Sequence, residues 1–298
     1  MKRQRQLEGY KSRAFAYTIL LIIALIVILL VCGWVVGGSQ TILAIAVASL
    51  FIFLAAPRLS PDLVMRFYRG RKIPYSELPE LHDDLEGLCR RAGLVKVPSL
   101  YLLQVPAPNA LSTGAAEEAA IAVSSGSFRL LNERELVAVM AHEVAHIVHG
   151  DNKLILVTEL VRQAVGTVSM LGIMVGIIAS WLSPDVHIPV WIFVLLAFAP
   201  MAAFLCQRAI SRLREFAADM KAVELMEDPE ALVTALMKID HHSRSMFKRL
   251  FGVEKDRDLP TLLQSHPDIG ERIERLMVLA KDISPKSPVF HRRLHSRF

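Results

Sequence analysis

The sequence predicts a mainly α-helical membrane protein that also carries a small α+β domain outside the lipid. Three observations support this fold class. The chain of 298 residues is 53% hydrophobic and has a mean hydropathy of +0.40, which is more apolar than ordinary soluble proteins. Four long apolar runs occur in two pairs, each with a short break between its members. The rest of the chain carries charges together with helical or alternating apolar patterns, which are typical of a water-soluble domain.

The first pair of apolar runs covers residues 14–37 and 41–56, and we expect both runs to cross a bilayer. The alternative is a secretory signal peptide. However, the first run is too long for that role, and no convincing cleavage site leads into a soluble mature chain. Both flanks of the pair are basic and its turn at 37–40 is neutral, which predicts that the N-terminus and everything after residue 57 face the cytoplasm. The basic flanking residues are Lys2, Arg3, Arg5, Lys11 and Arg13 before the pair and Arg58, Arg66, Arg69, Arg71 and Lys72 after it.

The second pair covers residues 164–182 and 190–206, which gives four predicted spans in two hairpins. Gly172 and Gly176 have the spacing that allows close helix packing, and Pro200 predicts a kink. A hairpin returns the chain to the side that it left. The predicted order is therefore an N-terminal tail and hairpin at 1–57, a first soluble part at 58–152, a hairpin within 153–207, and a second soluble part with a basic tail at 208–298.

The soluble parts contain recognisable helix and strand patterns. Helices are predicted at 77–92, 229–239 and 267–280, and strands at 99–104 and 119–124. Asn132 is a plausible N-cap for the helix that follows it, with Glu135 at the capping-box position. A short extended segment is expected at 109–114, where Ala110, Ser112 and Gly114 would leave a flat and accessible sheet edge.

Residues 142–146 have the sequence His-Glu-Val-Ala-His within a predicted helix. Positions i and i+4 share a helix face, so His142 and His146 can bind one Zn²⁺ ion per chain. Glu143, at the edge of that face, can take a proton from a metal-activated water, which then attacks a peptide carbonyl. The alternative is a surface helix that carries these residues by chance. The flanking residues are apolar on most sides, however, which predicts a buried helix whose His and Glu side chains need partners.

A third metal ligand is expected on a segment that can reach this helix, and Glu215 is the candidate. Asp219 follows it at i+4, so Asp219 can accept a hydrogen bond from a metal-bound histidine. The alternative is an ordinary helix end on which both carboxylates pair with Arg212 and Arg214 at the surface. Other histidines are weaker candidates. His149 is expected at the surface of a helix end, His241 and His242 in a solvated stretch after a helix, and His266 in a cap region.

The composition also limits the classes of binding partner that we expect. The net charge of +5 is modest, and the basic residues gather near the predicted membrane boundaries and at the C-terminus, so we expect contact with the lipid bilayer and none with nucleic acid. Cys32, Cys89 and Cys206 form no C-x-x-C pair and imply no disulfide framework, which fits a reducing compartment.

The chain resembles the HtpX-type integral-membrane zinc metalloproteases, which are related to the CAAX prenyl endopeptidases. This resemblance implies a zincin-like α+β catalytic domain and Glu215 as the third zinc ligand. It also implies that His266 and Arg272 reach the active site, and that Asn109 and Ala110 belong to an edge strand that pairs with an extended substrate. The chain departs from the expected pattern at Leu111 and His149. The resemblance covers nearly the whole length through the two hairpins and through Pro108-Asn109-Ala110, His142-Glu143-Val144-Ala145-His146 with Gly150-Asp151, Ser211-Arg212-Leu213-Arg214-Glu215-Phe216-Ala217-Ala218-Asp219, Ser265-His266-Pro267 and Arg272.

The predicted function is that of a membrane-embedded zinc endopeptidase whose active site faces the cytoplasm at the inner membrane. Its expected substrates are membrane proteins or unfolded polypeptides, and the resemblance implies turnover of damaged proteins. A CAAX-type prenyl-protein endopeptidase is the nearest alternative, although that branch usually has more than four spans. A catalytically silent zinc-bound membrane scaffold would have no need of Glu143. A transporter is disfavoured because the predicted spans carry essentially no charge.

Overall fold

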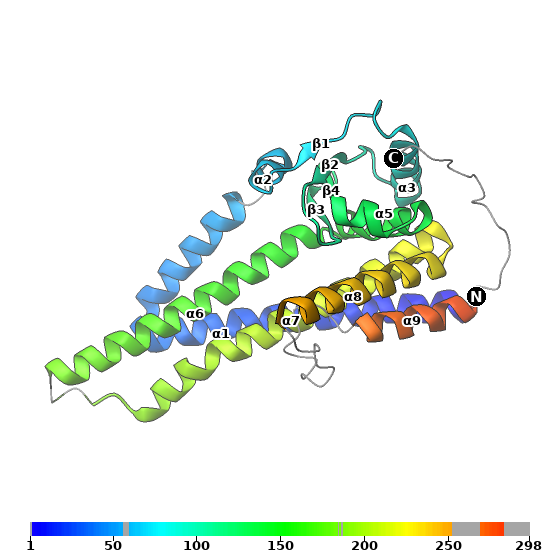
Figure 1. Ribbon diagram of the computed structural model, residues 1–298. Coiled ribbons are helices and arrows are strands. Elements are labelled where there is room, and N and C mark those ends of the chain that lie inside the picture. Colours follow the sequence, from blue (N-terminus) through cyan, green and yellow to red (C-terminus); the bar gives the residue numbers. More distant parts are fainter. Residues whose placement is uncertain (1, 56–59, 184, 186, 252–268, 283–298) are drawn as a thin grey trace. The chain divides into compact units, whose positions relative to one another are not determined.

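The computed structural model describes residues 2–55, 60–183, 185, 187–251 and 269–282 (Figure 1). The described elements are mainly helices together with one small mixed sheet. They form two compact units. The first contains the described residues of Met1–Ser60 and Gly150–Ala217. The second contains those of Pro61–His149, Ala218–Asp258 and Asp268–Phe298.

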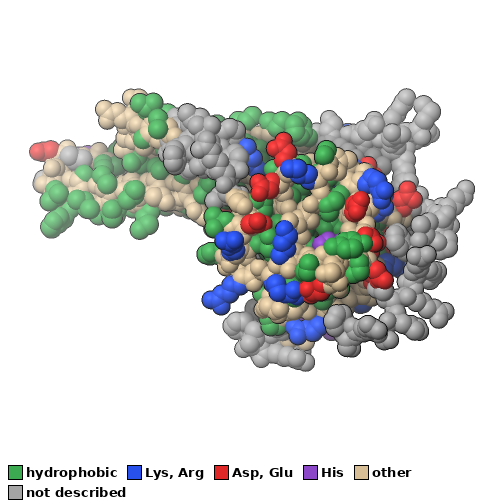
Figure 2. All heavy atoms as spheres, turned by 90° about the horizontal axis from the view of Figure 1, so that it is seen from above, with side chains coloured by type: hydrophobic (Ala, Val, Ile, Leu, Met, Phe, Trp, Pro, Cys, Tyr) green, Lys and Arg blue, Asp and Glu red, His purple; other side chains and the backbone are tan. Residues whose placement is uncertain are grey.

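The first unit carries the apolar helices. Among the described residues, three stretches are long and apolar enough to cross a membrane, judged by length and composition: Arg13–Ile45 in α1 (Lys2–Ala55), the whole of α6 (Asp151–Leu182), and α7 (Val190–Met226). Figure 2 shows mainly hydrophobic side chains on the visible part of these helices. The fourth predicted span, 41–56, extends over residues that lie outside the described side chains. The break between α6 and α7 falls at 183–189, as predicted.

Glycines shape this helical unit at two places. Gly37 and Gly38 interrupt α1 with non-helical dihedral angles, and the φ of +62° at Gly38 is one that other residues rarely adopt. The predicted turn is confirmed because a Cβ atom on Gly33 would lie only 2.5 Å from Cδ1 of Ile45, so the chain folds back there. A Cβ atom on Gly172 would lie 2.4 Å from Cγ2 of Val36, which confirms close helix packing at this glycine.

The second unit is built around a four-stranded sheet. Its strands are β1 (Arg71–Lys72), β2 (Ser99–Leu103), β3 (Ala110–Ala115) and β4 (Glu118–Ser124), in the order β1-β2-β4-β3. Strands β2 and β4 run parallel, whereas β1 and β3 are antiparallel to their neighbours. Strand β3 therefore forms one edge of the sheet among the described residues.

Strand β4 is buried on both of its faces. Ala120 and Ala122 pack in a cluster with Met65 of α2 (Pro61–Phe67). The alternate residues Ile121 and Val123 belong to the larger core, which also contains side chains of α3 (Pro79–Ala92) and α5 (Glu133–His149). This period of two is the normal consequence of strand geometry, and it places the sheet between α2 and the helical core.

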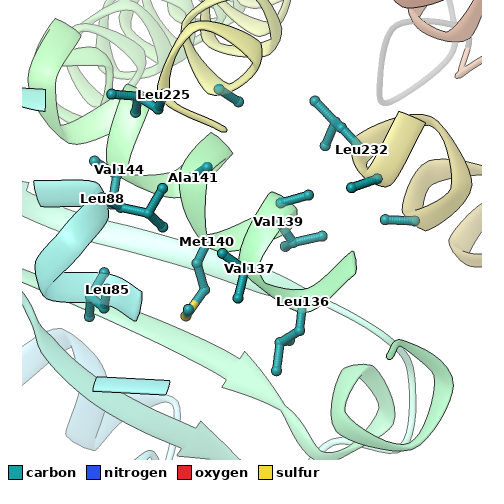
Figure 3. Close-up of a cluster of buried hydrophobic side chains, with 14 of the residues drawn as sticks. Leu85, Leu88, Leu136, Val137, Val139, Met140, Ala141, Val144, Leu225 and Leu232 are labelled. Atoms are coloured by element: carbon teal, nitrogen blue, oxygen red, sulfur yellow. The ribbon is translucent and has the colours of Figure 1, made fainter. Parts of the chain in front are cut away.

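Helix α5 runs through that core, and every residue from 135 to 147 is buried. Figure 3 shows side chains of α5 packed with Leu85 and Leu88 of α3, Leu225 of α7, and Leu232 of α8 (Pro229–Phe251). The prediction of a buried helix around the His-Glu-Val-Ala-His motif is thus confirmed, and the surface-helix alternative is wrong.

The later helices differ in part from the prediction. Helix α8 continues to Phe251, so His241 and His242 lie within a helix and not in a stretch after one. The sequence contains no Gly or Pro between residue 230 and residue 251, so nothing in it forces an earlier end. Helix α9 covers Ile269–Asp282, while the start predicted for it at residue 267 lies outside the described residues.

The predicted capping box at the start of α5 is confirmed. The N–H of Glu135 donates to Oδ1 of Asn132 at 2.9 Å, and the N–H of Asn132 donates to Oε2 of Glu135, also at 2.9 Å. Nζ of Lys238 in α8 donates to the same Glu135 oxygen at 2.7 Å. The buried Glu135 carboxylate therefore fixes the start of α5 and links it to α8.

Replacing Asn132 with Ala is expected to lower the free energy of unfolding by about 1 kcal/mol, because a backbone N–H at the helix start loses its acceptor. Thermal unfolding of the detergent-solubilised chain measures this as a fall in Tm of roughly 2–4 °C. Gln104→Ala, which removes an amide from an exposed position, serves as the control and should leave Tm unchanged. Equal Tm values for both variants would contradict the capping role.

Candidate metal centre

The two histidines of α5 point their outer ring nitrogens at the same place. Nε2 of His142 and Nε2 of His146 lie 3.1 Å apart, and the rings are nearly perpendicular. Two nitrogens bound to one tetrahedral zinc ion at about 2.0–2.1 Å would lie about 3.4 Å apart, so the observed spacing is close to that of a shared metal. Both side chains are buried.

Glu215 completes a group that could hold a metal ion. His142, His146 and Glu215 each offer one ligand atom, and these three atoms lie within 4.8 Å of one another. Two imidazoles and one carboxylate are a donor set that zinc uses in catalytic sites, where a fourth position stays open for water. The described residues thus bring the three predicted ligands together, and their chemistry and spacing fit zinc.

Asp219 lies one turn after Glu215 on α7 and contacts the first histidine. Oδ1 of Asp219 lies 3.0 Å from Nδ1 of His142. A proton on Nδ1 leaves the lone pair of Nε2 available, so this contact orients the ring and favours the tautomer that a metal requires. Asp219 thus lies beside His142, one of the candidate ligands, which is the contact that the sequence predicted for it.

Arg272 of α9 forms an ion pair with the same carboxylate. Its Nε and Nη2 donate to the two oxygens of Asp219 at 2.7 and 2.6 Å, and both side chains are buried. Asp219 lies 13 residues after Cys206, where the uncharged apolar run of α7 ends, and is therefore outside the predicted membrane span. Burial would raise the pKa of Asp219, but the Arg272 charge and the hydrogen bonds from His142 and Arg272 outweigh it and hold this pKa below its ordinary value. The carboxylate therefore stays ionised.

The remaining motif residues are placed as follows. Glu143 is buried on α5 directly beside His142. His149 is the last residue of α5 and is half-buried, so the prediction of a surface position is only partly correct. His266, the other residue that the resemblance places at the active site, lies outside the described residues.

The predicted substrate segment starts at the edge strand. Ala110 is the first residue of β3, and β3 contacts α5, the helix of the two histidines. Asn109 precedes Ala110, and both its backbone N–H and its backbone carbonyl group form hydrogen bonds. Its N–H donates to Oγ of Ser124 at 2.8 Å, and its carbonyl oxygen accepts from the N–H of Ser124 at 2.9 Å and from Oγ of Ser127 at 2.8 Å.

The sequence reasoning missed Ser124 and Ser127. A serine at the end of a predicted strand can also be the N-cap of a following helix, and this was the available signal. Ser124 is the N-cap of α4 (Ser125–Leu130), where its side chain accepts a hydrogen bond from the N–H of Ser127.

Known proteins resemble this chain over most of its length. The family model described as "Peptidase family M48" matches residues 76–280. The "Protease HtpX homolog" of Persephonella marina is 34% identical over 286 residues, which cover 89% of this chain and 96% of that protein. The protein of the same name from Methylibium petroleiphilum is 32% identical over 276 residues, with 88% and 96% covered.

A solved structure shares the fold. The crystal structure of S. mikatae Ste24p superposes with a TM-score of 0.52 at 20% sequence identity, and the match covers 93% of this chain but only 66% of that longer chain. The matched family stretch contains the helix of the two histidines, Glu215 and Asp219, and three of the helices that the structure describes are long and apolar enough to cross a membrane. On this evidence the chain belongs to peptidase family M48 and is a membrane metallopeptidase similar to the HtpX homologs.

Proposed function

We propose that the protein is a zinc-dependent endopeptidase of the inner membrane that cleaves membrane or unfolded proteins at the cytoplasmic face. The observation that carries this proposal is the convergence of His142, His146 and Glu215 with Glu143 beside them on a buried helix. The basic flanks of the first hairpin support the cytoplasmic orientation, since Lys and Arg are retained on that side.

Each side chain of the site has a separate role in the proposed reaction. His142, His146 and Glu215 would hold zinc, which when bound supplies a Lewis acid that activates water and stabilises negative charge on the attacked carbonyl. Glu143 accepts the proton that the attacking water gives up and later delivers it to the leaving amine. Asp219 keeps Nδ1 of His142 protonated. Arg272 acts through Asp219, because two of its nitrogens already bind that carboxylate.

The substrate would bind as an added strand. An extended peptide can pair with the β3 edge through backbone hydrogen bonds, and β3 contacts the helix that carries Glu143. Asn109 and Ala110 stand at the start of this edge, and the Ser124 hydroxyl holds Asn109 in place. Backbone hydrogen bonds depend little on the side chains of the substrate. This arrangement therefore supports a role in degrading many different unfolded or damaged proteins.

Removal of the metal is expected to abolish cleavage. We expect about one zinc ion per chain by elemental analysis, loss of cleavage of an unfolded model polypeptide after chelation, and recovery with one equivalent of Zn²⁺. A farnesylated peptide offered in parallel tests the CAAX-type alternative. Full activity in a chain stripped of metal would contradict the proposal, and stoichiometric zinc without any cleavage would identify a silent scaffold.

A further inference from the structure

A buried ion pair lies beside the third ligand. Asp151 is the first residue of α6 and its side chain is fully buried (0% exposed), and Nε of Arg214 on α7 donates to its Oδ1. The Arg214 side chain is itself only 13% exposed. A bond between a guanidinium and a buried carboxylate is strong and directional, because water competes little for either group.

The two members of this ion pair are close in sequence to the two segments that carry the candidate metal ligands. Asp151 follows α5 after a single residue, Gly150, which has a left-handed φ of +69° and separates α5 from α6. His146 is therefore only five residues before Asp151. Arg214 immediately precedes Glu215 on α7. One hydrogen bond thus links the segment just after the histidine helix to the helix turn that presents the carboxylate ligand.

Polar contacts lie on both sides of Glu215 along α7: Arg214 binds Asp151 just before it, and Asp219 contacts His142 and Arg272 one turn after it. The apolar packing between α7 and its neighbours in the first unit involves residues such as Leu196, Ala199 and Ala203, which lie three or more turns before Glu215. Apolar contacts of this kind tolerate small axial shifts. A bond to a buried carboxylate does not, because a shift leaves that charge uncompensated.

We propose that the Arg214–Asp151 ion pair is a positioning device for the metal centre, which holds Glu215 at the place where it can share a metal ion with the two histidines. The assignment rests on the proposed function, since it takes Glu215 as a zinc ligand. Neither Arg214 nor Asp151 touches the metal or the substrate in this account.

The direct test is the affinity of the full chain for Zn²⁺ alone, measured by competition with chromophoric chelators. Arg214→Gln and Asp151→Asn are each expected to weaken binding by about 10–100-fold, the usual effect of losing a group that orients a ligand. Arg214→Lys keeps the charge and should lose less. Arg162→Gln, which breaks a part-buried ion pair with Glu159 on α6, is the matched control and should bind zinc like the wild type.

The same variants in a Glu215→Gln background separate positioning from general stability. If Arg214 acts through Glu215, Arg214→Gln should cause no further loss of affinity once the carboxylate is gone. An equal loss in both backgrounds would overturn the proposal, as would wild-type affinity in Arg214→Gln and Asp151→Asn. A wild-type chain that binds no zinc would overturn the proposed function itself, and the positioning role with it.

Discussion

Replacing Glu143 with Gln is expected to reduce the rate of peptide cleavage by about 10³-fold while one zinc ion per chain stays bound. Gln has nearly the same shape as Glu but cannot accept the proton that the attacking water must lose. The side chain is not among the three that converge on the metal position, so its replacement leaves the ligand set intact. Cleavage of an unfolded polypeptide, with elemental analysis of the same preparation, measures both quantities.

Glu133→Gln provides the matched control. Glu133 is the first residue of the same helix and is exposed, so this variant makes the same chemical change on α5 far from the metal position and should retain full activity. Normal cleavage by Glu143→Gln would show that another group takes the proton. Loss of zinc from that variant would show that Glu143 helps to hold the metal.

Replacing Arg272 with Ala is expected to lower the free energy of unfolding by about 3–5 kcal/mol, because it leaves the buried Asp219 carboxylate without its strongest partner. The metal-free chain is the right sample, since changes in zinc affinity then do not contribute. Thermal unfolding should show a fall in Tm of roughly 10 °C. The pKa of Asp219 is lowered in the folded chain, so the stability it contributes is present above about pH 4 and is lost as the pH falls below that value.

Arg275→Ala separates this effect from the general cost of an alanine in α9. Arg275 pairs with Glu271 at the surface, where an ion pair contributes only about 0.5 kcal/mol or less. The double variant Asp219→Asn with Arg272→Met removes both charges and should be more stable than Arg272→Ala. Similar Tm values for Arg272→Ala and Arg275→Ala would show that the buried pair does not stabilise the fold.

Features that depend on neighbouring residues could be predicted from the sequence. The capping box at Asn132 and Glu135 is a local exchange of two hydrogen bonds, and the turn at Gly37 and Gly38 follows from backbone freedom. The pair His142 and His146 shares a helix face by periodicity alone. Two of the three candidate metal ligands, and the helix that carries them, could therefore be predicted without any knowledge of tertiary contacts.

Contacts between distant segments were out of reach. Arg272 meets Asp219 across 53 residues, and its two parallel hydrogen bonds depend on how α9 packs, which no local pattern encodes. The pair of Arg214 with Asp151 spans 63 residues. The sequence-based alternative placed Arg214 at a surface, because a charged helix end looks the same whether or not another element covers it.

The location of β3 at the sheet edge has a consequence for the choice of scissile bonds. A polypeptide that binds by adding a strand must offer its own N–H groups in an extended form, and proline lacks that donor. Stretches rich in proline would therefore resist cutting, and compact domains would be spared until they open. Under the proposed arrangement the enzyme would select substrates by their exposed main chain, so the loss of compact structure alone would be enough to expose a protein to cleavage.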